Sequence, residues 1–439
     1  MKNTHTLRRK KSAALLAALG ILLSTGCSQA AAVTATEPVY PKMVQYPSDG
    51  ETGWDKWHES LRKQRDSAPE GYSDTLWDFY GDSTRTFLSG AQENRAYSPL
   101  SLYMALSMLA ECASGESRGQ ILELMNAPDI ETLRTQAGQV WNSNYCDDGT
   151  LTSLLANSIW LSDDLQTDRG TINTLAGSYY ASTHAGKFGT DEMTAAIRNW
   201  LSRQTGGMLK DAVDSVAPPA ETLLALYSTV YFKGRWDDEF NKNLTDSRTF
   251  HAPSGDVETD FMNQSFERYY YWGDDFSAVR QGFVNGGDMW LILPDEDKSV
   301  DDVLDSGNYL RPLTEGDGYE NSRYMRVNLS VPKFDATSTI DLRDGLQALG
   351  VTDIFSDSAD FSALSPSGGL YVDSAKQSAR VTIDEEGCTA AAFTEILLCG
   401  SAAPAEDIQE IDFVLDRPFL FVVTGYDGQP LFTGTIYEL

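Results

Sequence analysis

The chain of 439 residues is 41% hydrophobic and 11% aromatic, a composition typical of a folded protein with a large core and not of a disordered one. It carries 64 acidic against 34 basic side chains, for a formal net charge of −30 at pH 7. Such an acidic body repels phosphate backbones and anionic lipids, so the composition argues against nucleic acid or a bare lipid surface as the partner.

The first 26 residues are predicted to be a signal peptide. Residues 8–11 are all basic, and the apolar stretch 12–23 is too short to span a bilayer. Small residues precede Cys27 as in the cleavage box of a bacterial lipoprotein, although Ser24 stands where a leucine is usual. We therefore expect an extracellular protein, lipid-anchored to a bacterial membrane through Cys27. A plain secretion signal, cut elsewhere, is the alternative.

Residues 27–70 are predicted to be a tether that lifts the following domain off the membrane, because small, polar, proline and charged residues dominate them. A short helix is expected around residues 54–65. Within it, Ser60 and Lys63 match S-x-x-K, the nucleophile motif of penicillin-recognising enzymes, but no K-T-G or S-D-N partner follows. An enzyme of that type is the remote alternative.

Residues 71–439 are predicted to form one α+β domain. Apolar residues recur at helical spacing in 75–88, in the stretch after 101 that runs through Ala110, in 120–125 and in 195–201. Residues 151–161 and 223–232 have the pattern of buried strands, and after Phe250 strands with polar turns dominate, apart from one helix near 341–349. Helices in the first half and strands in the second indicate a mixed fold with large antiparallel sheets.

No cysteine or histidine pattern indicates a metal site. The four histidines are scattered, and the cysteines beyond the signal form no C-x-x-C pair; these are Cys112, Cys146, Cys388 and Cys399. We expect buried thiols, with a bridge between Cys112 and Cys146 left open. The motifs G-x-S-x-G, the Walker loop and H-E-x-x-H are also absent, so we expect no metal and no cofactor.

The stretch TIDEEGCTAAAFTEILLCGSAAPAED, residues 382–407, places a turn, small residues and an unpatterned loop directly after a good strand. Counted with a period of two, it separates into two faces. One face holds only small or apolar side chains: Cys388, Ala390, Ala392, Thr394 and Ile396. The other carries Phe393 and Glu395. The segment can therefore be a helix or loop in one state and a strand, buried on one face, in another.

Six separated motifs make the region from Tyr72 to Leu439 resemble a serpin. In chain order they are NRAYSPLS (94–101), ASGESRGQI (113–121), VYFKGRW (230–236), VPKF (331–334), LGVTDIF (349–355) and FVLDRPFLF (413–421). The resemblance implies the serpin fold, with large mixed and antiparallel sheets and an exposed reactive-centre loop. It also implies a monomeric protease inhibitor that needs no cofactor and is not an enzyme.

By the same resemblance, the small-residue segment is the hinge of the reactive loop; the hinge residues are Glu385, Glu386, Gly387, Cys388, Thr389, Ala390, Ala391 and Ala392. In serpins a protease cleaves the loop and forms an acyl-enzyme, and the cut loop then inserts into the main sheet. The protease is trapped in a one-to-one covalent complex. Cys388 and Thr389 depart from the family's usual residues, so a non-inhibitory serpin that only binds a partner is the first alternative.

Two further clusters are implied by the resemblance. Where the sheet opens, the family has a buried polar cluster, matched here by Ser98, Ser101, Asn199 and Gln377. Gln377 takes the place of the family's usual histidine. At the end of the sheet, a region called the breach, Lys333 and Glu385 match an ion pair with Trp236 nearby.

The family spacing from Glu385 places the reactive bond between Ser401 and Ala402, whereas a count back from Pro418 points several residues later. Small residues around this bond suit a serine protease with a shallow primary pocket, of the elastase or subtilisin type. No arginine or lysine lies between Glu385 and Arg417, which argues against trypsin-like targets.

Overall fold

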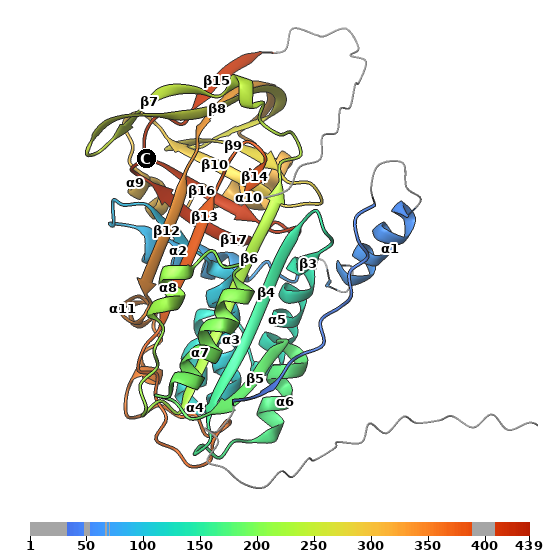
Figure 1. Ribbon diagram of the computed structural model, residues 1–439. Coiled ribbons are helices and arrows are strands. Elements are labelled where there is room, and N and C mark those ends of the chain that lie inside the picture. The colour runs from blue at the N-terminus through green and yellow to red at the C-terminus, as the bar shows by residue number, and fades with distance from the viewer. Residues whose placement is uncertain (1–32, 48–52, 66–67, 70, 389–408) are drawn as a thin grey trace, which may run out of the picture.

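Helices fill much of the first half of the chain and strands the second, as the sequence predicts (Figure 1). The computed structural model describes residues 33–47, 53–65, 68–69, 71–388 and 409–439. The helices are α1 (Trp54–Arg65), α2 (Leu76–Leu88), α3 (Pro99–Cys112), α4 (Gly115–Leu124), α5 (Ile130–Asn144), α6 (Arg169–Ser178), α7 (Asp191–Gln204), α8 (Lys210–Ser215), α9 (Val300–Ser306), α10 (Leu310–Glu315) and α11 (Arg343–Ala348).

Among the described residues, the strands form two large sheets and one two-stranded ribbon. The main sheet has the order β1-β5-β4-β6-β14, with β3 also on β4. Its strands are β1 (Thr34–Thr36), β3 (Cys146–Asp147), β4 (Thr152–Ser162), β5 (Ala181–Gly186), β6 (Leu224–Arg235) and β14 (Gly387–Cys388). The ribbon consists of β12 (Asp335–Asp341) and β13 (Lys376–Thr382). The main sheet is mixed, because β4 runs parallel to β5 and antiparallel to β6.

The second sheet has the order β15-β11-β8-β9-β10-β16-β17-β2, with β7 also on β8. Its strands are β2 (Arg95–Tyr97), β7 (Asp246–Ala252), β8 (Gly255–Trp272), β9 (Phe276–Gly282), β10 (Asp288–Pro294), β11 (Ser322–Pro332), β15 (Glu410–Val414), β16 (Phe419–Thr424) and β17 (Pro430–Ile436). The pairs β8–β11 and β10–β16 are antiparallel, and β15 joins β11 in parallel.

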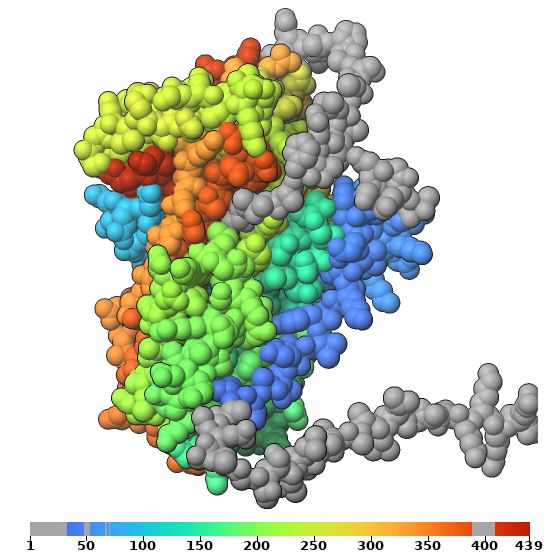
Figure 2. All heavy atoms as spheres, viewed as in Figure 1, coloured from blue at the N-terminus to red at the C-terminus, as the bar shows by residue number. Residues whose placement is uncertain are grey.

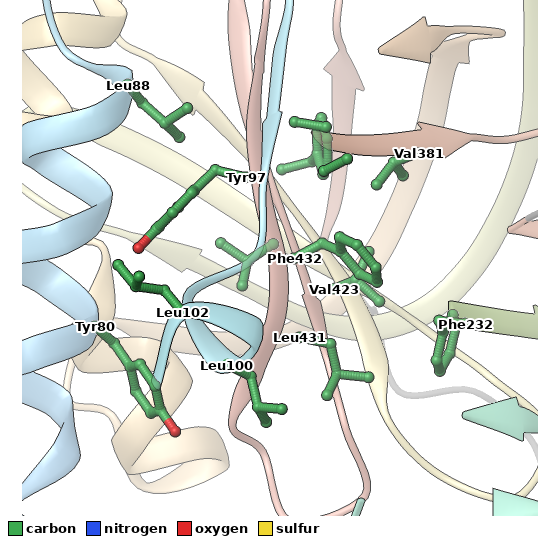
Figure 3. Close-up of a cluster of buried hydrophobic side chains, with 14 of the residues drawn as sticks. Tyr80, Leu88, Tyr97, Leu100, Leu102, Phe232, Val381, Val423, Leu431 and Phe432 are labelled. Atoms are coloured by element: carbon green, nitrogen blue, oxygen red, sulfur yellow. The ribbon is translucent and has the colours of Figure 1, made fainter. Parts of the chain in front are cut away.

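The ribbon and the main sheet lie side by side, and within the described residues their backbones pair only at the hinge, where Cys388 pairs with Gly234 of β6 and bridges to Ile383 just after β13. In the described part of the chain, β6 pairs only with β4 and β14, and β13 only with β12. The unpaired strip between β6 and β13 is covered on its inner face by the hydrophobic core. Figure 3 shows Phe232 of β6, Val381 of β13 and Phe432 of β17 reaching into this core, with Leu100 of α3 nearby. These side chains are almost completely buried.

Helix α3 supports the strip from that buried side. Pro99 occupies its first position, and the hydroxyl of Ser98 accepts a hydrogen bond from the Ser101 amide at 3.2 Å. Proline suits this position because its missing N–H would have no partner inside the helix. The helix therefore begins at Pro99, slightly before the stretch after residue 101 in which the sequence predicted it. Helix α5, which the sequence patterns did not predict, follows the N-cap Asp129.

Helix α7 lies on the opposite face of the main sheet. Its apolar side chains pack against Trp160 and Ala156 of β4; these are Met193, Ile197, Trp200 and Leu201. Their spacing of three or four residues places them on one face of the helix. The strip therefore lies between α3 on one face of the sheet and the α7–α8 region on the opposite face (Figure 1).

The described part of the predicted tether is packed against the domain. Strand β1 pairs with β5, and the ring of Tyr40 stacks on Trp141 at a centroid distance of 5.7 Å. Helix α1 has the predicted bounds, and the Trp57 indole donates a hydrogen bond to Asp148 at 3.1 Å. Figure 2 shows this segment in blue lying along the side of the body. The expectation of a free tether is therefore wrong for residues 33–47 and 53–65, because their aromatic side chains find partners on the domain.

Within the described residues, no helix is long and apolar enough to cross a membrane.

Substituting Tyr40 tests how firmly this segment is held. Tyr40→Ala removes the stacking on Trp141 and Tyr145. We expect it to lower the free energy of unfolding by about 2 kcal/mol, the scale for a large aromatic side chain that is only partly buried. Thermal unfolding measures this. The neighbouring Val39 is 89% exposed, and Val39→Ala should leave the melting temperature unchanged; equal effects of the two variants would contradict the docking.

Candidate functional site

The hinge begins as a tight hairpin between β13 and β14. Asp384 closes the turn: its carboxylate accepts hydrogen bonds from the amides of Glu386 at 2.9 Å and Gly387 at 3.1 Å. The backbone then pairs antiparallel with β6, Gly387 opposite Arg235 and Cys388 opposite Gly234. A Cβ atom on Gly387 would lie 2.2 Å from the Gly234 carbonyl oxygen, so only glycine allows this close approach.

Both glutamates at the hairpin tip are ion-paired. The Lys333 ammonium lies 2.8 Å from the Glu385 carboxylate, which also accepts a hydrogen bond from the Thr245 hydroxyl at 2.8 Å. Lys242 pairs with Glu386 at 2.6 Å. The first pair is much better shielded, because the Glu385 side chain is only 8% exposed. The structure therefore brings Lys333 and Glu385 together at this turn, where the hinge begins.

The environment of Glu385 favours its charged form. Burial by itself would raise the pKa of this carboxyl, but the hydrogen bonds from Lys333 and Thr245 outweigh it and hold the pKa below its usual range. The group is therefore ionised in the folded chain at neutral pH, and the ion pair contributes to stability under those conditions.

Trp236 fixes the turn to the end of β6. Its indole N–H donates to the Asp384 carbonyl at 2.8 Å, and its backbone amide donates to the Glu386 carbonyl at 3.1 Å. The ring stacks on Phe283 at 4.8 Å and is buried. Lys333, Glu385 and Trp236 thus form one cluster around the hairpin tip.

Next to Cys388, a cavity of about 30 Å³ lies between β6 and β13. Its walls come from both strands and from the α7–α8 connection, and include Phe232, Val381 and Met208. Cys388 itself is buried, and burial, reinforced by the charge of Asp384, raises the pKa of its thiol to about 12. The side chain is therefore a neutral, small residue at the mouth of this cavity.

A polar cluster lies where α3 meets both strands. The Gln377 side chain of β13 accepts a hydrogen bond from the Ser98 amide at 2.7 Å and donates to the Ser98 carbonyl at 2.9 Å. The Ser101 hydroxyl donates to the Ser228 carbonyl of β6 at 3.0 Å. On the α3 face of the strip, this cluster therefore contacts both β6 and β13. The glutamine side chain of Gln377 does not titrate.

Asn199, which was expected in this cluster, lies elsewhere. It is an exposed residue of α7, on the other face of the main sheet, and takes no part in these hydrogen bonds. Its placement by resemblance was wrong, because α7 packs on the face of the main sheet opposite to α3. The partner that Ser101 meets on β6 is the Ser228 carbonyl. Ser228 was missed, as were Thr245 and Lys242 at the hinge. Each of these residues contacts a partner far along the chain, so no local sequence pattern marks it.

Several predicted residues lie outside the described residues. These are Cys27, the hinge residues 389–392, and the bond between Ser401 and Ala402. Ser60 and Lys63 are on α1, away from the hinge. Cys112 and Cys146 are separate buried thiols, so the bridge left open by the sequence does not form. Within the described residues no group of histidine, cysteine or carboxylate side chains could hold a metal ion.

Comparison with known families gives one assignment across this whole region. Residues 78–439 match the family model described as Serpin (serine protease inhibitor). Serpin-ZXA of Oryza sativa subsp. japonica is 28% identical over 364 residues, covering 79% of this chain and 90% of the relative. Serpin-Z2A of Triticum aestivum is 30% identical, covering 78% of this chain and 89% of its own length. These relatives are plant proteins and do not bear on the predicted bacterial origin or lipid anchor.

Solved structures agree on the fold. The thermophilic serpin tengpin in its native state matches with a TM-score of 0.74 at 26% identity, over 85% of this chain and 95% of that one. An Arabidopsis serpin in a native stressed conformation matches with a TM-score of 0.70 at 24% identity, over 86% of this chain and 98% of that one.

The ion pair at the base of the hinge makes stability depend on pH. The pKa of Glu385 is lowered on folding, so the pair stabilises the chain at neutral pH and its contribution is lost as the pH falls through the folded pKa. Glu385→Gln should lower the free energy of unfolding by about 2 kcal/mol at pH 7, a buried-pair loss reduced by the partial exposure of Lys333.

Thermal or urea unfolding of the wild type and the variant across pH 3–7 measures this, and the two curves should converge at the acid end. The control is Glu386→Gln, which removes the more exposed pair with Lys242 and should cost under about 1 kcal/mol. A constant difference between Glu385→Gln and wild type over the whole pH range would refute the linkage.

Proposed function

The chain belongs to the serpin family of serine protease inhibitors, and from this premise we propose that it acts as a suicide substrate whose reactive loop inserts into the main sheet. It is an inhibitor and not an enzyme. The S-x-x-K motif at Ser60 therefore has no catalytic role, and no cofactor is needed.

The proposed reaction begins as ordinary proteolysis. The serine hydroxyl of the target attacks the carbonyl carbon of Ser401, and the bond to the Ala402 nitrogen breaks, with that nitrogen taking up a proton. The product is an ester between the protease and the N-terminal part of the loop. Hydrolysis would release the protease, so inhibition requires that loop insertion be faster than attack by water.

The observation that carries the proposal is that β6 and β13 are not paired with each other, while the hinge is already seated at the upper end of the strip between them. Gly387 and Cys388 pair with β6, which starts an antiparallel strand in the strip. A strand that continued from Cys388 would find unjoined strands on both sides. The alternating pattern of residues 388–396, small on one face, suits such a strand.

The proposed targets are serine proteases with a shallow primary pocket, of the elastase or subtilisin type. Gly400, Ser401, Ala402 and Ala403 have small side chains, and no basic residue lies between Glu385 and Arg417. A pocket that requires arginine or lysine finds nothing suitable in this stretch.

We propose that the protein works outside the cell, anchored to a bacterial membrane by lipid on Cys27 after removal of residues 1–26. The basic run at residues 8–11, the apolar stretch 12–23 and the small residues before Cys27 support this. The large negative charge of the body favours a monomer that stands clear of the anionic lipid surface.

A denaturing gel tests the inhibitory mechanism. Wild-type protein mixed with elastase should give a one-to-one band that survives SDS, and the cleaved protein should melt at a much higher temperature than the intact one. Cys388→Arg places a long cation at the mouth of a cavity of about 30 Å³. This variant should be cleaved without forming the stable band, whereas Cys388→Ser should behave as wild type. Simple cleavage of the wild type, with no band and no gain in melting temperature, would instead indicate a non-inhibitory serpin.

Mass spectrometry tests the reactive bond separately. The C-terminal peptide released after reaction with elastase should begin at Ala402, and a start outside residues 401–404 would show that the count from Glu385 is wrong. Subtilisin provides a second enzyme with a shallow pocket. Trypsin serves as the negative control, since it should produce neither the band nor this cut.

A further inference from the structure

The strip between β6 and β13 is bridged on both faces: by the polar cluster on the α3 side and by a second set of contacts on the α7 side. The connection between α7 and α8, residues 205–209, lies over the strip and helps to line the cavity below Cys388. It touches one strand on each side. This arrangement is independent of the polar cluster at α3, which reaches the strip from the opposite face.

On the β6 side, the connection packs against Tyr231. Gly206 has a φ of +58°, and a Cβ atom there would lie 2.7 Å from the tyrosine ring. The backbone therefore rests directly on the aromatic ring, in a conformation that glycine adopts most readily. Thr205 beside it is buried and donates its hydroxyl to the Leu201 carbonyl at 2.8 Å, which continues α7 into the connection.

On the β13 side, Arg380 makes three hydrogen bonds. Two go to the carboxylate of Asp335 on the neighbouring strand β12, at 2.8 and 2.6 Å. The third runs from the remaining terminal nitrogen to the backbone carbonyl of Met208, at 3.1 Å. The first two bonds lie within the β12–β13 ribbon. The third reaches out of the ribbon to the connection that rests on β6.

We propose that this third bond is a tie that limits how fast the strip opens, so that Arg380 is a positioning residue for loop insertion. The inference rests on the proposed function. A cavity of about 30 Å³ cannot hold even one strand residue, and neighbouring strands need a spacing of about 4.8 Å. A strand growing downward from Cys388 must therefore push β13 away from β6 at this level.

That movement separates the two contacts of the connection. If residues 205–209 stay on Tyr231, the bond from Arg380 to the Met208 carbonyl breaks. If they follow Arg380, the packing of Gly206 on the Tyr231 ring is lost. In both cases one of the two contacts of the connection has to break before the strand can extend past the cavity. The ion pair between Arg380 and Asp335 is not affected, because both residues belong to the ribbon and move with it.

Two variants separate the tie from the ion pair. In Arg380→Lys the single ammonium group can keep its contact with Asp335 but cannot also reach Met208, because lysine lacks the forked guanidinium. In Asp335→Asn the ion pair is lost and the bond to Met208 remains available. Both changes fall on half-exposed side chains of the same strand pair, so their general effects on stability should be similar.

The test measures opening of the strip without a protease. A labelled synthetic peptide with the sequence of residues 388–396 is incubated with intact full-length protein, and its uptake is followed on native gels. Arg380→Lys should take up the peptide about fivefold faster than wild type, as expected for loss of one charge-assisted hydrogen bond at a partly exposed position. Asp335→Asn should take it up within about twofold of the wild-type rate.

Equal rates for Arg380→Lys and wild type would overturn the tie, as would equal acceleration by both variants. The stable elastase complex then gives a second readout. With a faster insertion step, Arg380→Lys should need fewer inhibitor molecules per protease inhibited than wild type, and an unchanged ratio would count against the proposal. Absence of any elastase complex in the wild type would refute the proposed function, while the peptide uptake would still decide whether the tie exists.

Discussion

Two long strands lie side by side in this fold without the ladder of hydrogen bonds that would normally join them. The separation of β6 from β13 leaves the main sheet and the β12–β13 ribbon as neighbours held mainly by the core beneath them. A strand placed between them would form ladders on both edges, each bond worth ~1 kcal/mol net. If the loop inserts as proposed, the chain with a filled strip would be the more stable one, and the described state would persist because the contacts across the strip slow the entry of a strand.

In that proposal, a small number of polar contacts would slow strand entry from the two faces of the strip. Beneath the strip, the side chains of Ser98, Ser101 and Gln377 connect α3 to both strands. In front of it, the α7–α8 connection rests on β6 and bonds to Arg380 of β13. Hydrogen bonds of this kind are individually weak and directional, so they resist a small displacement and fail completely after a larger one. That behaviour suits a barrier that has to be crossed once.

The sequence predicted what depends on local patterns. Helical spacing located α2, and the pattern of buried strands located β4 and most of β6. The resemblance to serpins, and not a local pattern, implied the grouping of Lys333, Glu385 and Trp236. Local patterns failed where the partner lies far along the chain. The tether prediction failed because Tyr40 finds Trp141 and β1 finds β5 only in the folded molecule. Asn199 was misplaced because the local sequence does not show which face of the main sheet a helix covers, and α7 lies on the face opposite to α3.

The hinge also determines how a strand would sit in the strip. Since Gly387 lies opposite Arg235 and Cys388 opposite Gly234, an antiparallel continuation would bring Ala390 opposite Phe232, Ala392 opposite Val230 and Thr394 opposite Ser228. Phe232 points into the core, so the small residues would fill that side of the pleat. Phe393 and Glu395 would face the α7 side. The period-two pattern of the segment and the register of the first two paired residues thus agree on which face is buried, and a slip of one residue would drive Phe393 into the core.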